Sequence, residues 1–416
     1  MKTKTTPAKK AKKNTAHSLG KNPGRSKNPP LAQNPALAPA ASLAAILASY
    51  NTKAPLAEAS TIPAPWYTDP RIAELERHTV FSRNWLAIGR IDQLAHPGQF
   101  LTATVAGEPI VAVRGHDGVL RAFYNVCRHH AAAVVTDPCG QASILHCPYH
   151  GWNYGLDGSL KGTPEFEGVK NFDRKQNGLV PINVEIWEQF LFVNLDPAAP
   201  PLANFLGSLA RRVAPLGLRQ LHYFTSTSYD IACNWKVFVD NYLDGGYHVP
   251  HLHKGLKSVL DYKRYTIENE DRYCLQSSPM VVAKEAAAND AASAEDAATV
   301  ATRKGDRAWY FWLYPNFMFN CYQGYLDTNL VIPVDADHCR VIFDFYFADV
   351  SDSARSYNDQ SVAVGNRVQD EDLGICESVQ RGLKSRAYGA GRLSVRRESG
   401  EHCFHRLLAE DLKRGL

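Results

Sequence analysis

Apolar and polar positions alternate with a period of two through much of residues 85–198, and short turns rich in Gly and Asp separate the runs. Such alternation predicts β-strands, because successive side chains of a strand point to opposite faces of a sheet. The predicted strands cover residues 100–105, 109–114, 120–126, 181–188 and 190–196, with a hairpin over 153–162. This segment is therefore predicted to form a small all-β domain.

Apolar residues spaced three or four positions apart predict helices on both sides of the β-rich segment. The first helix is expected to begin at Asp69-Pro70, since Asp caps a helix and Pro fits its first turn. The second covers residues 361–383, and a strand is expected at 340–350. Residues 284–302 hold nine Ala, which predicts an exposed helix or loop inserted between strands. The predicted fold class is α+β.

The net charge of +4 conceals an uneven distribution of charge along the chain. Residues 1–57 hold nine Lys, one Arg and no acidic residue, whereas the rest of the chain holds 36 basic and 42 acidic residues. The leader is low in complexity, with room for one short helix at 40–50. It is expected to be a disordered basic tail or a transit peptide. The remainder is net acidic, which argues against nucleic-acid binding.

The chain has nine Cys, and seven of them lack any compact spacing: Cys139, Cys233, Cys274, Cys321, Cys339, Cys376 and Cys403. This scatter indicates reduced thiols in an intracellular protein rather than a disulfide framework. No apolar run is long enough to span a bilayer, so a soluble protein without membrane contact is expected. The expected compartment is the plastid stroma if residues 1–57 are a transit peptide, and otherwise a bacterial cytoplasm.

Two short motifs carry candidate metal ligands: Cys127-Arg128-His129 and, seventeen residues later, Cys147-Pro148-Tyr149-His150. Zinc sites use the same donors, but zinc fingers group their two Cys together and their two His together. Here each motif offers one sulfur and one nitrogen. That is the donor set of a Rieske [2Fe–2S] centre, in which two Cys bind one iron and two His bind the other. Zinc is the alternative that the spacing leaves open.

With Gly151 and Trp152, these motifs resemble the cluster loops of Rieske non-haem iron oxygenases. The resemblance implies four cluster ligands, two through sulfur and two through nitrogen: Cys127, Cys147, His129 and His150. His130 is interpreted as a neighbour of the cluster, and Trp152 as packing over it. The implied fold is an N-terminal Rieske-type all-β iron–sulfur domain followed by a catalytic domain with a helix-grip-like antiparallel sheet.

A second motif lies within residues 234–253, where Asn234-Trp235-Lys236 precedes two His in H-x4-H spacing. Members of this family bind a mononuclear Fe(II) through two His and one carboxylate. The resemblance implies three ligands: His248, His253 and Asp372. The last lies in an acidic segment where Asp370 and Glu371 are the alternatives, and His251 is interpreted as a neighbour of the site.

The resemblance also gives Asp244 a catalytic role, as the acidic residue that connects the two metal centres. A carboxylate bonded to an imidazole on either side can couple them. This chain departs from the usual pattern, because three residues rather than two separate Asp244 from His248, including the pair Gly245 and Gly246. Asp240 is the alternative bridging residue.

The resemblance covers about residues 60–416 and implies four segments. They are the tail (1–57), an N-terminal arm of the catalytic domain (58–84), the Rieske domain (85–200) and the mononuclear iron domain (205–416). The stretch around Gly245 and Gly246 most resembles choline monooxygenases. That likeness implies hydroxylation of choline to betaine aldehyde hydrate with O₂, the first step of glycine betaine synthesis.

The implied partners are a ferredoxin or ferredoxin-type reductase and further copies of the chain in a homotrimer. The residues themselves give one independent indication of the substrate. Aromatic side chains crowd residues 309–325, and aromatic faces can hold a quaternary ammonium. They would suit an arene equally well. The alternative is therefore an oxygenase or N-demethylase that acts on another quaternary amine or on an aromatic acid.

Overall fold

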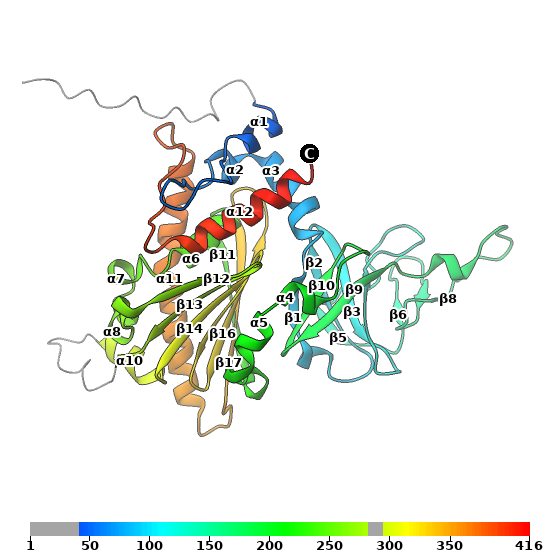
Figure 1. The fold of residues 1–416 in the computed structure, drawn as a ribbon. Coiled ribbons are helices and arrows are strands. Elements are labelled where there is room, and N and C mark those ends of the chain that lie inside the picture. The colour runs from blue at the N-terminus through cyan, green and yellow to red at the C-terminus, as the bar shows by residue number, and fades with distance from the viewer. Residues whose placement is uncertain (1–40, 282–293) are drawn as a thin grey trace, which may run out of the picture. The chain divides into compact units, whose positions relative to one another are not determined.

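The computed structural model describes residues 41–281 and 294–416, and the predictions made for residues 1–40 and 284–293 lie outside this part of the chain. Within the described residues, the strands form two seven-stranded sheets and one three-stranded sheet (Figure 1). Helices flank the second large sheet, so the α+β class predicted from the sequence is confirmed.

The first large sheet, with strand order β1-β10-β9-β4-β3-β2-β5, builds the N-terminal β domain. Its strands are β1 (Leu86–Arg90), β2 (Gln99–Val105), β3 (Glu108–Arg114), β4 (Leu120–Tyr124), β5 (Cys139–Gln141), β9 (Pro181–Trp187) and β10 (Phe190–Asn194). The small sheet contains β6 (Leu145–His146), β7 (Asn153–Tyr154) and β8 (Leu160–Gly162). Each strand predicted between residues 100 and 196 is present, with ends shifted by at most two residues.

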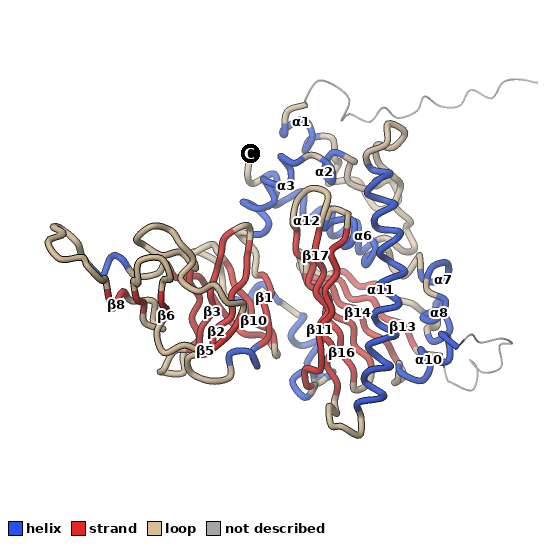
Figure 2. The backbone as a smooth tube through the Cα atoms, turned by 180° about the vertical axis from the view of Figure 1, so that it is seen from behind, coloured by secondary structure: helices blue, strands red, loops and turns tan. Residues whose placement is uncertain are grey.

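The second large sheet has the order β11-β17-β16-β15-β14-β13-β12, and its neighbouring strands are antiparallel. The strands are β11 (His222–Ile231), β12 (Thr266–Asn269), β13 (Tyr273–Pro279), β14 (Arg307–Leu313), β15 (Phe317–Tyr322), β16 (Tyr325–Pro333) and β17 (Cys339–Phe347). The long helix α11 (Arg355–Leu383) runs beside these strands (Figure 2). It begins six residues earlier than the sequence predicted, and Gly365 lets its backbone approach the Phe345 ring.

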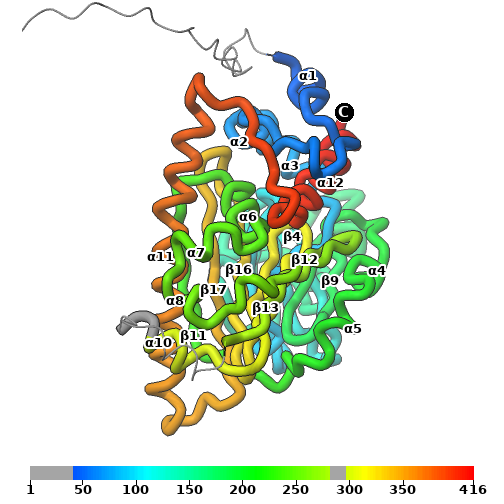
Figure 3. The backbone as a smooth tube through the Cα atoms, turned by 60° about the vertical axis from the view of Figure 1, so that its left-hand side comes forward, coloured from blue at the N-terminus to red at the C-terminus, as the bar shows by residue number. Residues whose placement is uncertain are grey.

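The remaining α-helices are α1 (Leu43–Ala48), α2 (Pro65–Thr68), α3 (Pro70–Glu76), α4 (Leu202–Leu206), α5 (Leu209–Val213), α6 (Trp235–Leu243), α7 (Val249–Leu252), α8 (Lys254–Val259), α10 (Ala294–Thr302) and α12 (Ser399–Lys413). A π-helical turn covers Arg77–Phe81, and short 3₁₀ turns cover Ile91–Leu94, Arg174–Asn177, Ala214–Leu216, Leu218–Gln220 and Tyr262–Arg264. Helices α1 to α3 gather beside α12, so the two ends of the described chain meet (Figure 3).

The two faces of the second sheet have different environments. On β15, Phe317 and Phe319 point toward the N-terminal domain, where Phe317 lies 5.1 Å from the ring of Phe190 and Phe319 lies 5.9 Å from that of Trp187. The next residue, Asn320, points the other way, into a cavity beneath α6 and α11. Because strand side chains alternate, the same strands bind the neighbouring domain and line the cavity.

Two sequence expectations need correction. The tail was expected to extend to residue 57, but α1 is packed within the core, with Leu47 buried and the Trp66 indole donating a hydrogen bond to the Ile46 carbonyl. The apolar residues of this short helix, which the sequence allowed, explain the difference. The described part of the Ala-rich insertion is a helix, α10, but it is not simply exposed, since Thr299 and Thr302 are fully buried.

The N-terminal arm is joined to the catalytic domain by one buried ion pair. Lys236 Nζ lies 2.6 Å from Glu76 Oε1, and the adjacent Trp235 indole donates to Glu76 Oε2 at 2.8 Å. Burial lowers the pKa of Lys236, and the charge of Glu76 opposes that shift. The Asn234-Trp235-Lys236 motif therefore has a structural role: Asn234 caps α6 while the next two residues fix that helix to α3.

We predict that Glu76→Ala lowers the free energy of unfolding by about 3–5 kcal/mol, because it leaves a buried ammonium without its partner. Glu74→Ala is the matched control on the same helix. Its partner Arg77 and Glu74 itself are about half exposed, so the change should stay below about 1 kcal/mol. Urea unfolding followed by circular dichroism measures both, and equal losses would contradict the prediction.

Candidate active site and metal centres

Helix α6 ends in a tight turn that positions Asp244. Gly245 and Gly246 adopt φ angles of +69° and +67°, a region that side chains disfavour. A Cβ at Gly245 would lie 2.1 Å from the Arg397 carbonyl oxygen. The turn brings the Asp244 carboxylate back to the backbone N–H groups of Tyr247 and His248, both at 3.0 Å. The additional Gly therefore allows a tight turn. Because of this turn, Asp244 still contacts His248 although three residues, rather than the usual two, separate them.

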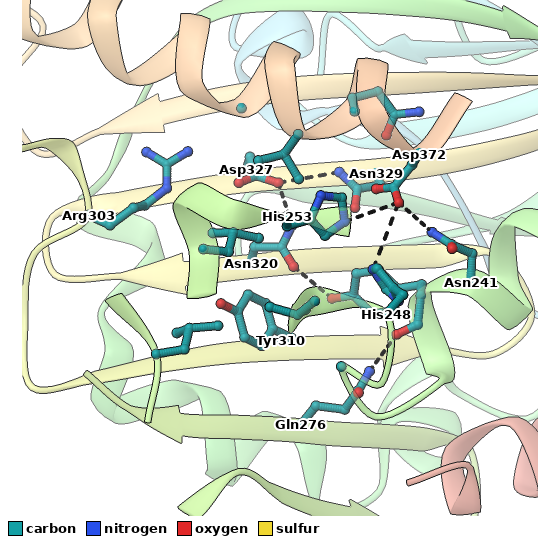
Figure 4. A pocket seen from close by; sticks show the side chains of 18 of the residues that line it. Asn241, His248, His253, Gln276, Arg303, Tyr310, Asn320, Asp327, Asn329 and Asp372 are labelled. Carbon is teal, nitrogen blue, oxygen red and sulfur yellow. Dashed lines mark hydrogen bonds and ion pairs between the residues drawn. The ribbon is translucent and has the colours of Figure 1, made fainter. Parts of the chain in front are cut away.

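Three predicted ligands converge at one point beneath the sheet. The candidate ligand atoms of His248, His253 and Asp372 lie within 4.8 Å of one another. Asp372 Oδ1 is 3.1 Å from His253 Nε2 and 3.8 Å from His248 Nε2, and the Asn241 amide donates to the same oxygen at 2.9 Å (Figure 4). His251 is exposed and is not part of this group.

The Nδ1 atom of each His is held by a carboxylate. Asp244 Oδ2 lies 2.6 Å from Nδ1 of His248, and Glu371 Oε2 lies 2.6 Å from Nδ1 of His253. A carboxylate there keeps the proton on Nδ1, which leaves the Nε2 lone pair for a metal. Burial alone would lower the pKa of His253, but Asp372 and Glu371 outweigh it and raise the pKa. Glu371, an alternative ligand in the sequence, has this orienting position in the structure.

Asp240 does not contact the imidazole of a candidate iron ligand, which a residue that bridges the two metal centres would have to do. Its carboxylate accepts a hydrogen bond from the Tyr67 hydroxyl at 2.5 Å and lies 2.9 Å from His405 Nε2. Glu401 is nearby, 3.8 Å from the same His405 nitrogen. Between the two candidates that the sequence left open, Asp244 is the one that contacts the imidazole of a candidate ligand, His248.

The residues present fit a mononuclear iron. Two imidazole Nε2 atoms and one carboxylate oxygen form the facial donor set typical of non-haem Fe(II) oxygenases, which leaves coordination positions open for O₂. Both imidazoles have the carboxylate support that ligating His residues require. Zn²⁺ can also bind two His and one carboxylate, so the donor set alone does not separate the two metals.

The first metal motif forms two loops of closely similar shape. In the first, the Ala131 N–H donates to the Cys127 carbonyl and the Cys127 N–H donates to Ala132. In the second, Gly151 donates to the Cys147 carbonyl and Cys147 donates to Trp152. Ala131 and Gly151 both have positive φ, +60° and +70°. The two loops therefore share one backbone conformation. They also lie close together, since the rings of His129 and His150 are 4.7 Å apart. Each loop carries one Cys and at least one His.

Within these loops the sulfur and nitrogen donors have different exposure. Cys127 and Cys147 are buried, and the Tyr154 hydroxyl lies 3.3 Å from Cys127 Sγ. The imidazole rings of His129 and His150 lie 4.7 Å apart toward the surface. Trp152 stacks on His129 with 7° between the ring planes, which agrees with its predicted packing role. A [2Fe–2S] cluster would fit with its sulfur-bound iron inward and its imidazole-bound iron outward.

His130 lies beside His129 and His150, which agrees with its interpretation as a neighbour of the cluster. One ring nitrogen from each of His129, His130 and His150 lies within 4.8 Å of the others. Proximity alone does not distinguish the three, so the choice of His129 and His150 as ligands stays a prediction.

Comparisons with known families agree with both centres. Residues 84–173 match the Rieske [2Fe-2S] domain, and residues 218–414 match the ring hydroxylating alpha subunit catalytic domain. The choline monooxygenase of Arabidopsis thaliana chloroplasts is 37% identical over 379 residues, which is 88% of this chain and 86% of the relative. The chain belongs to the Rieske non-haem iron oxygenases.

Other relatives of this Rieske oxygenase are bacterial. The carnitine monooxygenase oxygenase subunit of Escherichia coli K12 is 34% identical over 373 residues, 86% of this chain and 95% of that protein. A solved quaternary ammonium Rieske monooxygenase, CntA, superposes with a TM-score of 0.75 at 31% identity, covering 85% of this chain and 95% of CntA. The expected family, two-domain fold and monooxygenase class are confirmed.

Family membership implies both cofactors, a Rieske [2Fe–2S] cluster and a mononuclear iron. The enzyme is an oxidoreductase that uses O₂, a small-molecule substrate and a redox partner. Among residues 41–281 and 294–416, no helix is both long and apolar enough to cross a bilayer.

A cavity of about 120 Å³ lies beside the three candidate ligands (Figure 4). One row of residues crosses its sheet wall in register, from β13 to β16: Gln276, Tyr310, Asn320 and Asp327. Burial raises the pKa of Tyr242, Tyr265 and Tyr310 well above the usual value, so these rings remain neutral phenols. The sequence indicated the aromatic residues, but only strand register could identify Gln276 and Asp327 as part of the wall.

We predict that Glu371→Gln weakens Fe(II) binding about 10–100-fold, since the carboxylate that orients His253 is lost. Asp370→Asn is the matched control, because Asp370 is the neighbouring acid on α11 and is exposed. Anaerobic Fe(II) titration of protein stripped of its mononuclear iron measures the affinity of each variant. Equal affinities for Glu371→Gln and the wild type would show that Glu371 does not orient a ligand.

Proposed function

We propose that this Rieske oxygenase hydroxylates a quaternary ammonium alcohol, choline, to betaine aldehyde hydrate. The observation that carries the proposal is the cavity beside His248, His253 and Asp372, whose walls present the aromatic rings of Tyr265, Tyr310 and Tyr322. Aromatic faces attract a trimethylammonium group, which can neither donate nor accept a hydrogen bond. The relatives named for choline and carnitine support the same substrate class.

The proposed ligands are those that the sequence predicted. Cys127, His129, Cys147 and His150 would hold the cluster, and His248, His253 and Asp372 would hold the mononuclear iron. When bound, these cofactors supply electrons and O₂ activation. Choline, O₂, two electrons and two protons then give betaine aldehyde hydrate and water. The chain orients both imidazoles through Asp244 and Glu371 and holds the Asp372 carboxylate through the Asn241 amide.

The helical side of the cavity is apolar. Phe238, Val249 and Leu256 contribute apolar surface on the helical side, opposite the polar row of the sheet. An apolar lining would limit the access of water to the site and so limit side reactions. The proposed electron donor is a ferredoxin or ferredoxin-type reductase. The proposed assembly is a homotrimer, in which Asp244 would connect His248 to a cluster imidazole of the neighbouring subunit.

We predict that the full-length enzyme consumes O₂ with choline when a reduced ferredoxin system supplies electrons, and that betaine aldehyde forms in step. Glycine betaine, L-carnitine and benzoate are the competing substrates, and each should support slower uptake. The protein should contain about three iron atoms per chain. Uptake with benzoate and none with choline would refute the proposal, and two iron atoms per chain would indicate an electron carrier.

A variant of the bridging acid tests the electron path. Asp244→Asn removes the carboxylate that orients His248, so it should weaken mononuclear iron binding about as much as Glu371→Gln does. With Fe(II) supplied to saturation, both cofactors should be present, while the reduced cluster is no longer oxidised by O₂ in the presence of substrate. Stopped-flow absorbance follows the cluster, and iron analysis confirms its retention. Asp240→Asn is the comparison. If it, and not Asp244→Asn, stops cluster oxidation, Asp240 is the bridging residue.

A further inference from the structure

Asp327 is a buried carboxylate at the end of the polar row in the cavity. Its residue is 5% exposed, and it lies directly across from Asn320 in the pairing of β15 with β16. The amides of Asn320 and Asn329 donate to its Oδ1 atom at 2.6 and 3.3 Å, which leaves Oδ2 without an amide donor. Figure 4 shows Asp327 facing the same space as Tyr310 and the ligand imidazoles.

No ion pair among residues 41–281 and 294–416 includes Asp327. The nearby Arg303 does not neutralise it by direct contact. The Arg303 guanidinium donates to Ser361 Oγ at 2.7 Å and to the Tyr325 hydroxyl at 3.2 Å, and lies over the Tyr325 ring at 4.2 Å. These contacts hold Arg303 against α11 and β16 in the lining of the same cavity, where its guanidinium also lies 5.2 Å from the centre of the Tyr322 ring.

The negative charge of the buried Asp327 carboxylate is not neutralised by an ion pair within the described residues. Burial raises the pKa of Asp327, and the charge of Arg303 and hydrogen bonds from Asn320, Tyr325 and Asn329 offset part of that rise. Buried charges in proteins are normally paired or bound to a cation, because desolvation penalises an isolated charge. The cavity therefore offers aromatic faces and a carboxylate that forms no ion pair within the described residues, and the Arg303 guanidinium lies in the same lining, hydrogen-bonded to other groups.

We propose that Asp327 is the counter-ion of the substrate's quaternary ammonium group and gives the enzyme its preference for monocations over zwitterions. This inference rests on the proposed function, since it concerns the same cavity. The ammonium would lie between Oδ2 of Asp327 and the rings of Tyr310 and Tyr322, whose hydroxyls bond to each other at 2.7 Å. A zwitterion would bring a second carboxylate toward Asp327, while Arg303 is already hydrogen-bonded elsewhere.

The charge contribution can be measured without turnover. Choline and its uncharged carbon analogue, 3,3-dimethylbutan-1-ol, have nearly the same shape and differ in charge. Anaerobic calorimetry of the holoenzyme should show choline binding about 10–100-fold more tightly than the analogue. Asp327→Asn should weaken choline by about the same factor and leave the analogue within about threefold, which also shows that the variant cavity is intact. Tetramethylammonium, which carries the same charge as choline, should also bind less tightly to Asp327→Asn than to the wild type.

Asp230→Asn is the matched control, an exposed Asp on β11 of the same sheet that pairs with Arg340. It should change neither affinity. The proposal is overturned if the wild type binds the uncharged analogue as tightly as choline, if no cation binds, or if Asp327→Asn binds choline normally. Choline binding that depends on Asp327 without turnover would defeat the proposed function alone. If the enzyme turns over choline but binds choline and the uncharged analogue equally tightly, this inference is wrong and the proposed function stands.

Discussion

The candidate iron site depends on two carboxylates outside the group of candidate ligands. Asp244 and Glu371 each hold an imidazole by Nδ1, and this turns the Nε2 atoms of His248 and His253 toward Asp372. Asp244 is four residues from the His that it holds, whereas Glu371 reaches its His from 118 residues along the chain. The donor set therefore forms only when α11 has packed against the segment after α6, and packing of the catalytic domain and assembly of the site are one event.

The cluster loops follow a different principle. Each loop closes through hydrogen bonds between residues four or five positions apart, with a positive φ angle at Ala131 or Gly151. Each is thus fixed by its own backbone, and Tyr154 joins the first loop to the small sheet through the Arg128 N–H. One centre is built from local turns near the surface, with His150 exposed. The other is built from distant elements inside the domain, with His253 buried. This contrast suits a cluster that must meet redox partners and an iron that must exclude water.

The sequence predicted most strands of the first domain, because strand alternation is a local property, and its short motifs proposed ligands for both centres. The structure brings three of the proposed residues together, His248, His253 and Asp372. The sequence could not determine the role of Glu371, since an acidic run such as Gln369–Glu377 offers several carboxylates, and only the rotation of α11 decides which one faces His253. It also overestimated the tail, because α1 is too short to be convincing alone and is ordered by contacts with residues such as Trp66. The three spacer residues after Asp244 looked like a departure, and the left-handed turn at Gly245 accounts for them.

The register of the second sheet connects substrate selection to domain packing. Tyr310, Asn320 and Asp327 meet across β14, β15 and β16, while their chain neighbours Phe311, Phe319 and Leu326 form the opposite face against the N-terminal domain. A slip of one residue in any of these strands would exchange the two sets, exposing aromatic rings to the cavity and burying polar groups between the domains. The apolar contact between domains therefore selects the register that brings Asp327 to the cavity. Variation at the cavity positions alone can change the substrate while the domain contact stays intact.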